Sequence, residues 1–394
     1  MVLDASGNVY TAGYYSGTVD FNPGNGIFNL TSAGGINNDI FILKLDALGN
    51  FVWAKSMGGT THDEAYSIAL DASGNVYSTG YFGASADFDP GPSTFNLTSN
   101  GIKDIFISKL DAFGNFVWAK SMGVEFDWPF ALAIDASGNV YSTGLFDGTA
   151  DFDPGPGTYN LTSIGETDIF ISKINASGNF VWAKSIGGIL DDKGNSITSD
   201  ASGNVYITGI YRGTVDFNPG PGVYNLYSPG NIFVCKLDHF GNFIWAGSIA
   251  GIYFEEGNAI SVDAYGDVYT VGYFEGAVDF DPSAGIFNLQ TYIGGGMPSS
   301  NGASDIFVQK MSLTPVSINE LQNNIPIAVY PNPSNSVFTI ETTSKSNFEI
   351  IDIKGRVILK GKINNPKTVI DLSGFESGIY FLAIESQSIK LIKM

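Results

Sequence analysis

Short stretches in which apolar and polar residues alternate recur along most of this 394-residue chain. Within residues 64–121, four such stretches follow one another, at 65–70, 75–82, 104–110 and 116–121. A period of two residues is typical of β-strands, and glycine-containing turns separate the first stretch from the second and the third from the fourth. This segment is therefore predicted to form two hairpins, that is, four antiparallel strands.

The turn between the first two strands has the sequence Asp-Ala-Ser-Gly-Asn, and it recurs along the chain. Copies begin at Asp4, Asp71, Asp135 and Asp200, and a degraded copy begins at Asp263. An aspartate can cap its own turn and glycine supplies the positive φ of the reversal, so we interpret the pentapeptide as a hairpin turn. A four-stranded unit repeated every 63–67 residues predicts an all-β fold, namely a β-propeller with at least five blades.

The position of the chain ends within the repeat suggests an incomplete propeller. The repeats open on a second strand and end on a third strand, residues 305–310. We expect the closing strand and a signal peptide to lie upstream of Met1, in a part of the protein lost by truncation.

Aromatic residues occupy fixed places in successive units, and we predict that they pack between neighbouring blades. They are Trp53, Trp118, Trp182 and Trp245 in the fourth strand, and Phe41, Phe106, Phe170, Phe233 and Phe307 in the third.

After residues 1–312 the repeat stops. We predict a linker at 313–326 and a second domain at 327–394, in which seven short strands indicate a small immunoglobulin-like β-sandwich.

The repeat region up to residue 315 has 11 basic and 32 acidic residues, against 8 and 7 in the remainder. Such an acidic surface disfavours nucleic acid as a partner. No apolar run approaches the ~18 residues that a transmembrane helix needs.

The second domain contains a set of short motifs whose residues include Pro331, Asn332, Pro333, Gly355, Gly378, Tyr380 and Lys390. With these motifs it resembles the C-terminal sorting domain of the type IX secretion system. The resemblance implies export across the outer membrane, contact with the translocon and its sortase, and a final location in the medium or on the cell surface.

The repeat region resembles a bacterial β-propeller repeat family, the SBBP type. In the second unit the shared elements are Asp87-Phe88-Asp89-Pro90-Gly91, Asp104-Ile105-Phe106, Lys109-Leu110-Asp111 and Trp118-Ala119-Lys120. This resemblance implies a fold and a surface location but no particular activity.

Two sets of recurring acids are candidate ligands for Ca²⁺, a hard cation that prefers oxygen. The first set lies in Asp-x-Asp or Asp-x-Asn loops, whose members are Asp20 with Asn22, Asp87 with Asp89, Asp151 with Asp153, Asp216 with Asn218, and Asp279 with Asp281. The alternative for these loops is a turn held by side-chain to backbone hydrogen bonds.

The second set precedes each first strand and comprises Asp63, Asp127, Asp192 and Glu255. If the first strand is innermost, these acids should surround one mouth of the central channel and could bind a cation or a cationic ligand. The alternative is that they are solvated loop charges.

Nucleophilic and zinc chemistry have little support in the sequence. Cys235, the only cysteine, stands where sister repeats have leucine, serine or glutamine, and His62 and His239 occupy different places in the repeat.

The leading hypothesis is a secreted or surface-displayed, non-catalytic propeller that binds a glycan or a protein, with Ca²⁺ as the candidate cofactor. The alternatives are a glycan-acting hydrolase and a purely structural surface protein. An enzyme should break the symmetry of its own repeats at one place. The least symmetric loop is 124–129, in which Trp128 joins the acids Glu125 and Asp127.

Overall fold

The fold of the chain is built from strands alone in its described part, which confirms the predicted all-β class. The structure, a computed structural model, describes residues 1–124, 126–251, 253, 255–282, 286–293, 297–298, 304–312, 327–342, 345–352, 356–384 and 387–394. These residues include no helix that is long and apolar enough to cross a membrane. The chain divides into two units, Met1–Pro315 and Val316–Met394, and the predicted linker 313–326 lies outside the described residues.

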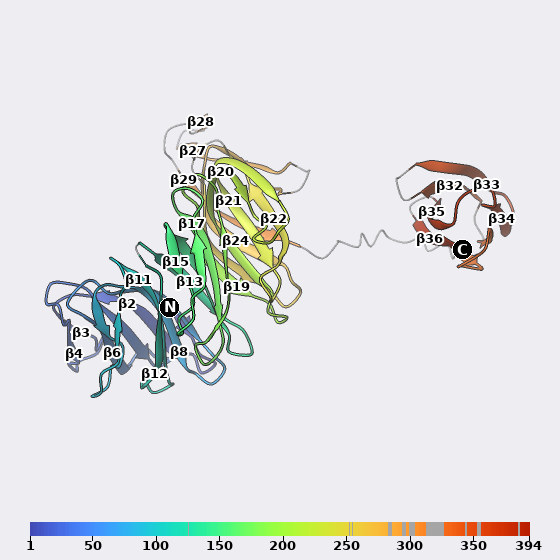
Figure 1. Ribbon diagram of the computed structural model, residues 1–394. Coiled ribbons are helices and arrows are strands. Elements are labelled where there is room, and N and C mark those ends of the chain that lie inside the picture. The colour runs from blue at the N-terminus through green and yellow to red at the C-terminus, as the bar shows by residue number, and fades with distance from the viewer. Residues whose placement is uncertain are drawn as a thin grey trace. The chain divides into compact units, whose positions relative to one another are not determined.

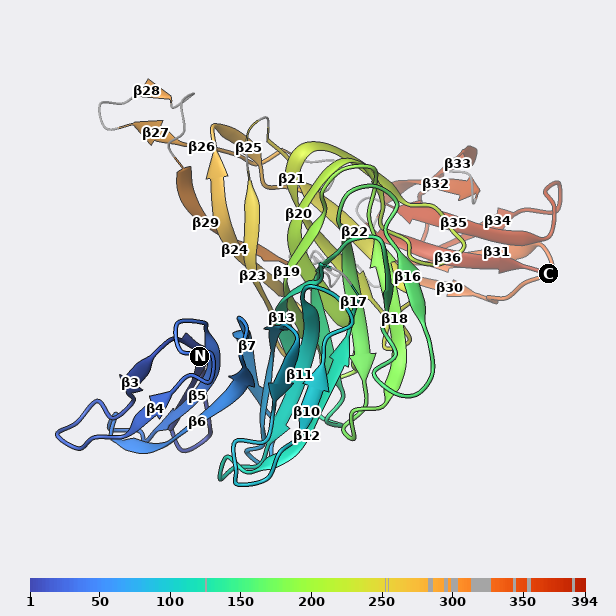
Figure 2. The same ribbon diagram turned by 60° about the vertical axis from the view of Figure 1, so that its left-hand side comes forward.

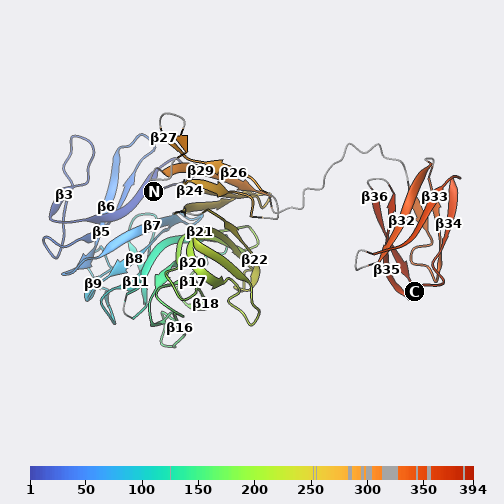
Figure 3. The ribbon, with the colours of Figure 1, turned by 90° about the horizontal axis from the view of Figure 1, so that it is seen from above.

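Unit 1 consists of antiparallel sheets that follow one another in chain order around a common centre, as a propeller requires (Figures 1 and 3). Blade 1 contains β1 (Val2–Leu3), β2 (Val9–Tyr15), β5 (Asp39–Leu45) and β6 (Phe51–Gly59), and blade 2 contains β7 (Glu64–Leu70), β8 (Val76–Phe82), β11 (Asp104–Leu110) and β12 (Phe116–Met122). Blade 3 contains β13 (Trp128–Ile134), β14 (Val140–Phe146), β17 (Asp168–Ile174) and β18 (Phe180–Ile186).

The next two blades differ in the number of their strands. Blade 4 contains β19 (Lys193–Ser199), β20 (Val205–Asp216), β21 (Asn225–Leu237) and β22 (Phe243–Ile249). Blade 5 has three strands in the described part of the chain, β23 (Glu256–Val262), β24 (Val268–Glu275) and β29 (Ser304–Met311). The predicted strands of the second unit agree with β7, β8, β11 and β12 to within a residue. We expected the repeats to open on the second strand of a blade. Instead, the short strand β1 precedes it and pairs with β2, at the place of a first strand.

The first strand of each blade lies innermost. β7, β13, β19 and β23 contact one another in turn, and the amide of Leu132 in β13 donates a hydrogen bond to Ser67 Oγ in β7 (3.2 Å). The apolar core lies between blades rather than within them. In one cluster, Ile105 and Ile107 of blade 2 pack with Val140 and Phe170 of blade 3. Each blade therefore depends on its neighbours to bury its faces.

The repeated pentapeptide forms the predicted hairpin turn. In the copy at Asp71, Oδ1 accepts the amides of Ser73 (2.9 Å) and Asn75 (3.0 Å), and Gly74 has φ +79°. The Tyr77 hydroxyl also donates to Asp71 Oδ2 (3.1 Å). The same bonds recur at Asp4, Asp135 and Asp200, which explains why the turn sequence is repeated so faithfully.

A small second hairpin, absent from the sequence prediction, stands between the second and third strands of a blade. In blade 4 this hairpin is formed by extensions of β20 and β21. In the other blades it consists of separate short strands, which are β3–β4 (Thr18–Asp20, Asn29–Thr31), β9–β10 (Ser85–Asp87, Asn96–Thr98), β15–β16 (Thr149–Asp151, Asn160–Thr162) and β25–β26 (Ala277–Asp279, Asn288–Gln290). The end of β6 pairs with β9 of the next blade, at Gly58↔Asp87. A last short pair, β27 (Tyr292–Ile293) with β28 (Met297–Pro298), precedes β29.

The recurring aromatic residues pack between blades, as predicted. Phe106 and Phe170 are fully buried, and Trp118 Nε1 donates to the carbonyl of Ala176 in blade 3 (3.3 Å). Trp182 Nε1 donates in the same way to the carbonyl of His239 in blade 4 (3.1 Å). The indoles are therefore structural.

Unit 2 is a sandwich of two antiparallel sheets, as predicted. Phe338, Ile350, Leu382 and Leu391 belong to both sheets and share one core. One sheet contains β30 (Ala328–Tyr330), β31 (Val337–Glu341) and β34 (Lys367–Asp371), and the other contains β33 (Val357–Ile363), β32 (Ser346–Asp352), β35 (Gly378–Ile384) and β36 (Gln387–Lys393).

Candidate functional site

The aspartates of the Asp-x-Asp and Asp-x-Asn loops are hydrogen-bonded to their own backbone. Asp87 Oδ1 accepts the amides of Asp89 (3.0 Å) and Phe95 (2.8 Å), and Asp89 Oδ1 accepts the amide of Gly91 (2.8 Å). The leading acid makes the same pair of bonds in all the loops, that is, at Asp20, Asp151, Asp216 and Asp279. These contacts are those of the turn that was the alternative to a calcium loop.

The acids that precede the first strands, Asp63, Asp127, Asp192 and Glu255, are buried between blades. We call them the junction acids. Asp63 accepts the amide of Gly59 at the end of blade 1 (2.7 Å) and the amide of Gly83 in blade 2 (3.1 Å). Asp192 likewise accepts the amides of Gly188 (2.7 Å) and Arg212 (2.9 Å), which belong to blades 3 and 4.

The other two junction acids bind the loop that precedes them. Asp127 Oδ2 accepts the amide of Val124 (2.8 Å), and Glu255 Oε1 accepts that of Tyr253 (3.4 Å). All four junction acids are at most 1% exposed. The expectation that they surround an open channel mouth is therefore wrong, and so is the alternative that they are solvated charges. Their carboxylates replace water as acceptors for backbone amides where the chain passes from blade to blade.

Burial changes the acidity of the junction acids. It raises the pKa of Asp63 and Asp192 to about 7 and that of Glu255 to about 8, against the opposing effect of the amide hydrogen bonds. The neighbouring carboxylates Asp39 and Asp168 add to the rise at Asp63 and Asp192. In the described part of the chain, no three His, Cys, Asp or Glu side chains converge as metal ligands. The Ca²⁺ hypothesis stays a prediction, and the geometry shows these acids in structural contacts.

One position of the inner strands differs from blade to blade. The residue that directly follows each junction acid is Glu64 in blade 2, Trp128 in blade 3, Lys193 in blade 4 and Glu256 in blade 5. All four pair with the equivalent residue of their second strand, so they stand at the same place in the fold. An acid, an indole and an amine at one repeated position cannot all serve the same packing role.

In blades 2 and 3 these side chains meet. Glu64 accepts hydrogen bonds from the Tyr66 hydroxyl (2.6 Å) and from Asn38 Nδ2 (2.7 Å). The Lys103 ammonium lies 3.7 Å from the ring centre of Tyr81 and 4.4 Å from that of Trp128. Tyr66 and Tyr81 also lie 6.0 and 5.3 Å from Trp128, between ring centres. The result is an aromatic patch that contains one cation and one anion.

The contacts continue into blades 4 and 5 through Phe130, whose ring is nearly parallel to that of Trp128 (13°, 6.3 Å). The Lys193 ammonium lies 4.6 Å from the ring centre of Phe130 and 2.9 Å from Glu256 Oε1. Glu256 Oε2 accepts the Tyr273 hydroxyl (2.8 Å). We call Glu64, Tyr66, Tyr81, Lys103, Trp128, Phe130, Lys193, Glu256 and Tyr273 the inner-strand cluster.

The two carboxylates of the inner-strand cluster are held ionised. Burial acts to raise the pKa of Glu64, but hydrogen bonds from Tyr66, Asn38 and Tyr81 and the charge of Lys103 outweigh it and lower that pKa. At Glu256 burial is likewise outweighed by Lys193, Tyr273 and Asn195, and the pKa is lowered. Trp128 Nε1 is buried without a hydrogen-bond partner among the described residues, and an unpaired donor of this kind is unusual in a folded protein.

Sequence reasoning found only part of this cluster. It singled out Trp128, which lies at the centre, and Asp127, which is buried behind it, while Glu125 lies outside the described residues. It missed the tyrosines and lysines, because each looks ordinary within its own repeat. Aligning the repeats shows that Glu64, Trp128, Lys193 and Glu256 share one position of changing chemical type. The position before it by two residues changes as much, with His62, Phe126 and Asp191, so alignment alone does not single out the cluster.

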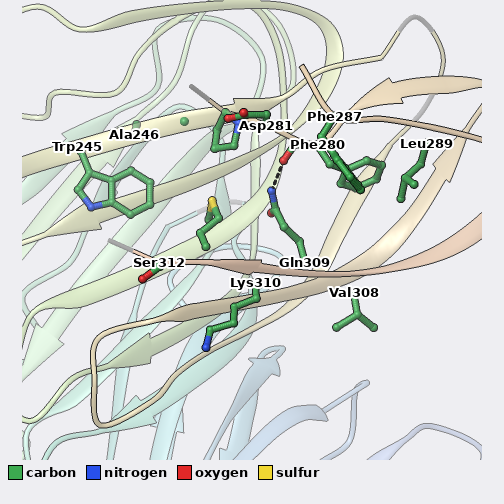
Figure 4. A pocket seen from close by; sticks show the side chains of 13 residues that line it. Trp245, Ala246, Phe280, Asp281, Phe287, Leu289, Val308, Gln309, Lys310 and Ser312 are labelled. Carbon is green, nitrogen blue, oxygen red and sulfur yellow. Dashed lines mark hydrogen bonds between the residues drawn. The ribbon is translucent and has the colours of Figure 1, made fainter. Parts of the chain in front are cut away.

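A separate pocket of about 620 Å³ lies between blade 4 and blade 5 (Figure 4). Trp245, Phe280, Phe287 and Leu289 line its wall, and Gln309 of β29 donates a hydrogen bond to the carbonyl of Phe280 (2.5 Å). β29 is the outermost described strand of blade 5, at the place where the other blades have a fourth strand (Figure 2). Its residues Val308, Gln309, Lys310 and Met311 line the pocket.

The motif residues of unit 2 hold its last strand. Asn332 donates to the carbonyl of Lys390 (2.6 Å) and accepts the amide of Ile392 (2.9 Å), so the Pro-Asn-Pro segment of Pro331 and Pro333 is tied to β36. Gly378 begins β35, in which the Tyr380 hydroxyl donates to the carbonyl of Glu376 (2.6 Å). Gly355 lies outside the described residues. The role of these residues in sorting stays a prediction.

Unit 2 matches a known protein family. Residues 328–394 match the family described as secretion system C-terminal sorting domain. This confirms the sorting domain that the motifs predicted. A domain of this kind implies secretion or a location at the outer cell surface.

Two curated proteins are similar to part of this chain. A WD repeat-containing protein of Acanthamoeba polyphaga mimivirus is 29% identical over an alignment of 278 residues that covers 61% of this chain and 18% of that protein. The regulatory protein FlaEY of Caulobacter vibrioides is 27% identical over 179 residues, which are 45% of this chain and 18% of that protein. The matched segments are thus less than a fifth of the length of either relative.

Two solved structures have a limited likeness to the chain. One is a protein of unknown function from Bacteroides caccae, with 10% identity, a TM-score of 0.33, and 82% of this chain and 90% of that chain covered. The other is PorZ, a surface component of the type IX secretion system of Porphyromonas gingivalis, with 14% identity, a TM-score of 0.31, and 99% and 58% covered.

Proposed function

We propose that this protein is cargo of the type IX secretion system, and that its propeller is a non-catalytic module that binds a glycan at the outer cell surface through the inner-strand cluster. The observation that carries the proposal is the break in symmetry. Glu64, Trp128, Lys193 and Glu256 occupy one repeated position, differ in chemistry, and join into one continuous set of contacts.

The composition of the inner-strand cluster favours a sugar as the ligand. Partly exposed aromatic rings at Tyr66, Trp128 and Phe130 offer apolar faces for the C–H surface of a pyranose ring. Ionised carboxylates and ammonium groups beside them can accept from and donate to hydroxyl groups. A few convergent polar groups among aromatic side chains are typical of small-molecule sites.

Binding without turnover agrees with the acidities of the surrounding carboxylates. A glycosidase needs one carboxylic acid that stays protonated near neutral pH beside another that is ionised. Both carboxylates of the cluster have a lowered pKa. The junction acids with a raised pKa, Asp63, Asp192 and Glu255, are fully buried, out of reach of a glycosidic oxygen.

The binding part of the proposal is tested by screening the full chain against a glycan array and measuring each hit by titration calorimetry. We expect Trp128→Ala to weaken binding at least tenfold. The matched control is Phe113→Ala, which removes an exposed aromatic ring from a hairpin turn, and it should bind as the wild type does. Equal affinities for both variants, or the absence of any hit, would overturn the glycan assignment, and release of new reducing ends would overturn the non-catalytic one.

The export part of the proposal is tested separately in a host that carries the type IX system. With a Sec-type signal peptide placed before Met1 in both proteins, deleting residues 328–394 should retain the propeller in the periplasm, whereas the full chain should reach the surface or the medium. Surface exposure of the shortened chain, detected by protease accessibility on intact cells, would contradict the proposal.

A further inference from the structure

Lys103 places its ammonium group among three aromatic rings. The distances from Nζ to the ring centres are 3.7 Å for Tyr81, 4.4 Å for Trp128 and 5.8 Å for Phe126. Tyr81 belongs to blade 2, Trp128 begins the inner strand of blade 3, and Phe126 lies in the loop before that strand. We call these three rings the Lys103 cage. A cation within about 6 Å of a ring centre is attracted by the π electrons of the ring, so all three rings contribute.

The Lys103 ammonium differs from the other lysines that lie over rings in this propeller. Lys109 lies 4.8 Å from the ring centre of Tyr77 and 3.8 Å from the carboxylate of Asp71, and Lys236 in blade 4 repeats both contacts with the equivalent residues. The Lys103 ammonium instead faces three rings, and it has no hydrogen bond or ion pair among the described residues. The Lys103 cage is therefore not part of the repeated pattern.

A lysine is also exceptional at this position of the repeat. The residue directly before the third strand is Asn38 in blade 1 and Thr167 in blade 3. Each of them donates a hydrogen bond to an acid near the start of the next blade, at 2.7 Å and 2.9 Å. The fold does not require a charge at Lys103, because a short polar side chain is sufficient in the neighbouring blades.

The Lys103 ammonium is poorly compensated in the cage, and the cage is open to solvent. Burial lowers the pKa of Lys103, and the charge of Glu64 opposes this effect without reversing it. Tyr81 forms the base of the cage and is 3% exposed, whereas Phe126 at its rim is 42% exposed. Lys103 and Trp128 are partly exposed. A ligand that brings its own cation can therefore enter from the side of Phe126 as the lysine side chain leaves.

We propose that the Lys103 cage binds the primary ammonium group of an unacetylated amino sugar, and that Lys103 occupies the cage as an internal substitute in the free protein. This inference rests on the proposed glycan function and names the class of glycan. An amino sugar presents the same ammonium group as Lys103, and the ionised Glu64 supplies a negative charge near it. Tyr66 and Phe130 of the inner-strand cluster remain for the sugar ring.

The charge of the repeat region agrees with this class of ligand. Up to residue 315 the chain has 32 acidic residues and 11 basic ones. The resulting field attracts a cationic glycan and repels a glycan that carries carboxylate or sulfate groups. A hard metal ion is a poor occupant of the Lys103 cage, since such an ion needs oxygen ligands and the cage offers ring faces.

The ligand side of the inference is tested with the full chain and two oligosaccharides that differ in charge. These are the tetramer of glucosamine and the tetramer of N-acetylglucosamine, titrated at pH 6 in a calorimeter. We expect the glucosamine tetramer to bind at least tenfold more tightly, because acetylation removes the ammonium group. Equal or tighter binding of the acetylated tetramer, or glycan-array hits confined to neutral or acidic sugars, overturns this inference and leaves the glycan function in place. The absence of any glycan hit overturns the proposed function and this inference together.

The protein side is tested with variants. Lys103→Gln removes the competing ammonium and should strengthen binding of the glucosamine tetramer at least threefold. The matched control is Lys109→Gln, which removes the same charge from a tyrosine ring of the same blade and should leave the affinity unchanged. Phe126→Ala, a change at an exposed ring, should weaken binding at least fivefold. Equal affinities for Lys103→Gln and Lys109→Gln would overturn the inference.

A measurement on the wild type does not depend on how the variants fold. Ring currents of the cage shift the NMR signals of the Lys103 side chain away from those of an exposed lysine. These signals should move to the ordinary lysine position as the glucosamine tetramer is added. Saturable binding of the tetramer that leaves them in place would show that Lys103 is not displaced, and would overturn the inference.

Discussion

Asp63 and Glu64 are adjacent in the sequence, yet they belong to two regions of the propeller that obey different rules. Asp63 is a junction acid, fully buried, with a pKa raised to about 7, and sister blades repeat it as Asp127, Asp192 and Glu255. Glu64 belongs to the inner-strand cluster, has a lowered pKa, and is replaced in other blades by tryptophan and lysine. In this protein, repetition marks what holds the blades together, and departure from repetition marks the candidate binding surface.

The largest expected effect of a single substitution is at a junction acid. Asp192→Ala removes the acceptor of two buried amides, those of Gly188 and Arg212. Each buried donor left unpaired costs about 1–3 kcal/mol, so we expect the free energy of unfolding to fall by about 2–6 kcal/mol in urea denaturation. A loss below 1 kcal/mol would show that water replaces the carboxylate without penalty, and would remove the structural role assigned to this region.

The two regions should also respond to pH in opposite directions. Because the pKa of Asp192 is raised to about 7 on folding, the folded state binds more protons than the unfolded state above pH 4, and its stability falls as pH rises from about 4 to about 7. Glu64 has a lowered pKa, so its contribution is lost instead as pH falls below the ordinary range of a glutamate.

We therefore expect the melting temperature of the wild type to fall between pH 5 and pH 8, and the fall to be smaller in Asp192→Asn, which has no group to titrate. Differential scanning calorimetry of both proteins in buffers of equal ionic strength measures this difference. Parallel pH profiles for the two proteins would exclude Asp192 as a group with a raised pKa.

A smaller effect is expected within the inner-strand cluster. Lys193 and Glu256 form a partly buried ion pair at 2.9 Å, and Lys193 also lies over the ring of Phe130. A double-mutant cycle with Lys193→Met and Glu256→Gln should give a coupling energy of about 0.5–1.5 kcal/mol in unfolding, and each single variant should weaken glycan binding severalfold. Additive effects on stability would show that the two side chains do not depend on one another.

The smallest effect is expected in the acidic loops. Asp153→Asn should change the free energy of unfolding by less than about 0.5 kcal/mol, because Asn22 and Asn218 already occupy the equivalent place and accept the same amide as Asp153 does. Measuring the melting temperature of both proteins with and without Ca²⁺ tests the calcium hypothesis for this loop. A rise in melting temperature with Ca²⁺ in the wild type that disappears in Asp153→Asn would establish a calcium loop instead of a turn.

The sequence alone determined the repeating unit, its four strands, the hairpin turn at Asp71 and the sorting domain. These follow from local rules, because strand alternation, a turn aspartate and a turn glycine act over a few residues. The sequence also drew attention to Trp128, through the irregularity of its loop.

Only the tertiary structure decided the surroundings of each acid. Asp63 and Glu64 are one residue apart, and nothing local distinguishes them. The amides of Gly59 in blade 1 and Gly83 in blade 2 converge on Asp63. Asn38, which directly precedes β5, and Lys103, which directly precedes β11, lie around Glu64. The inner-strand cluster likewise joins residues from successive repeats that lie about 64 positions apart, and only the packing of one blade on the next brings them into contact.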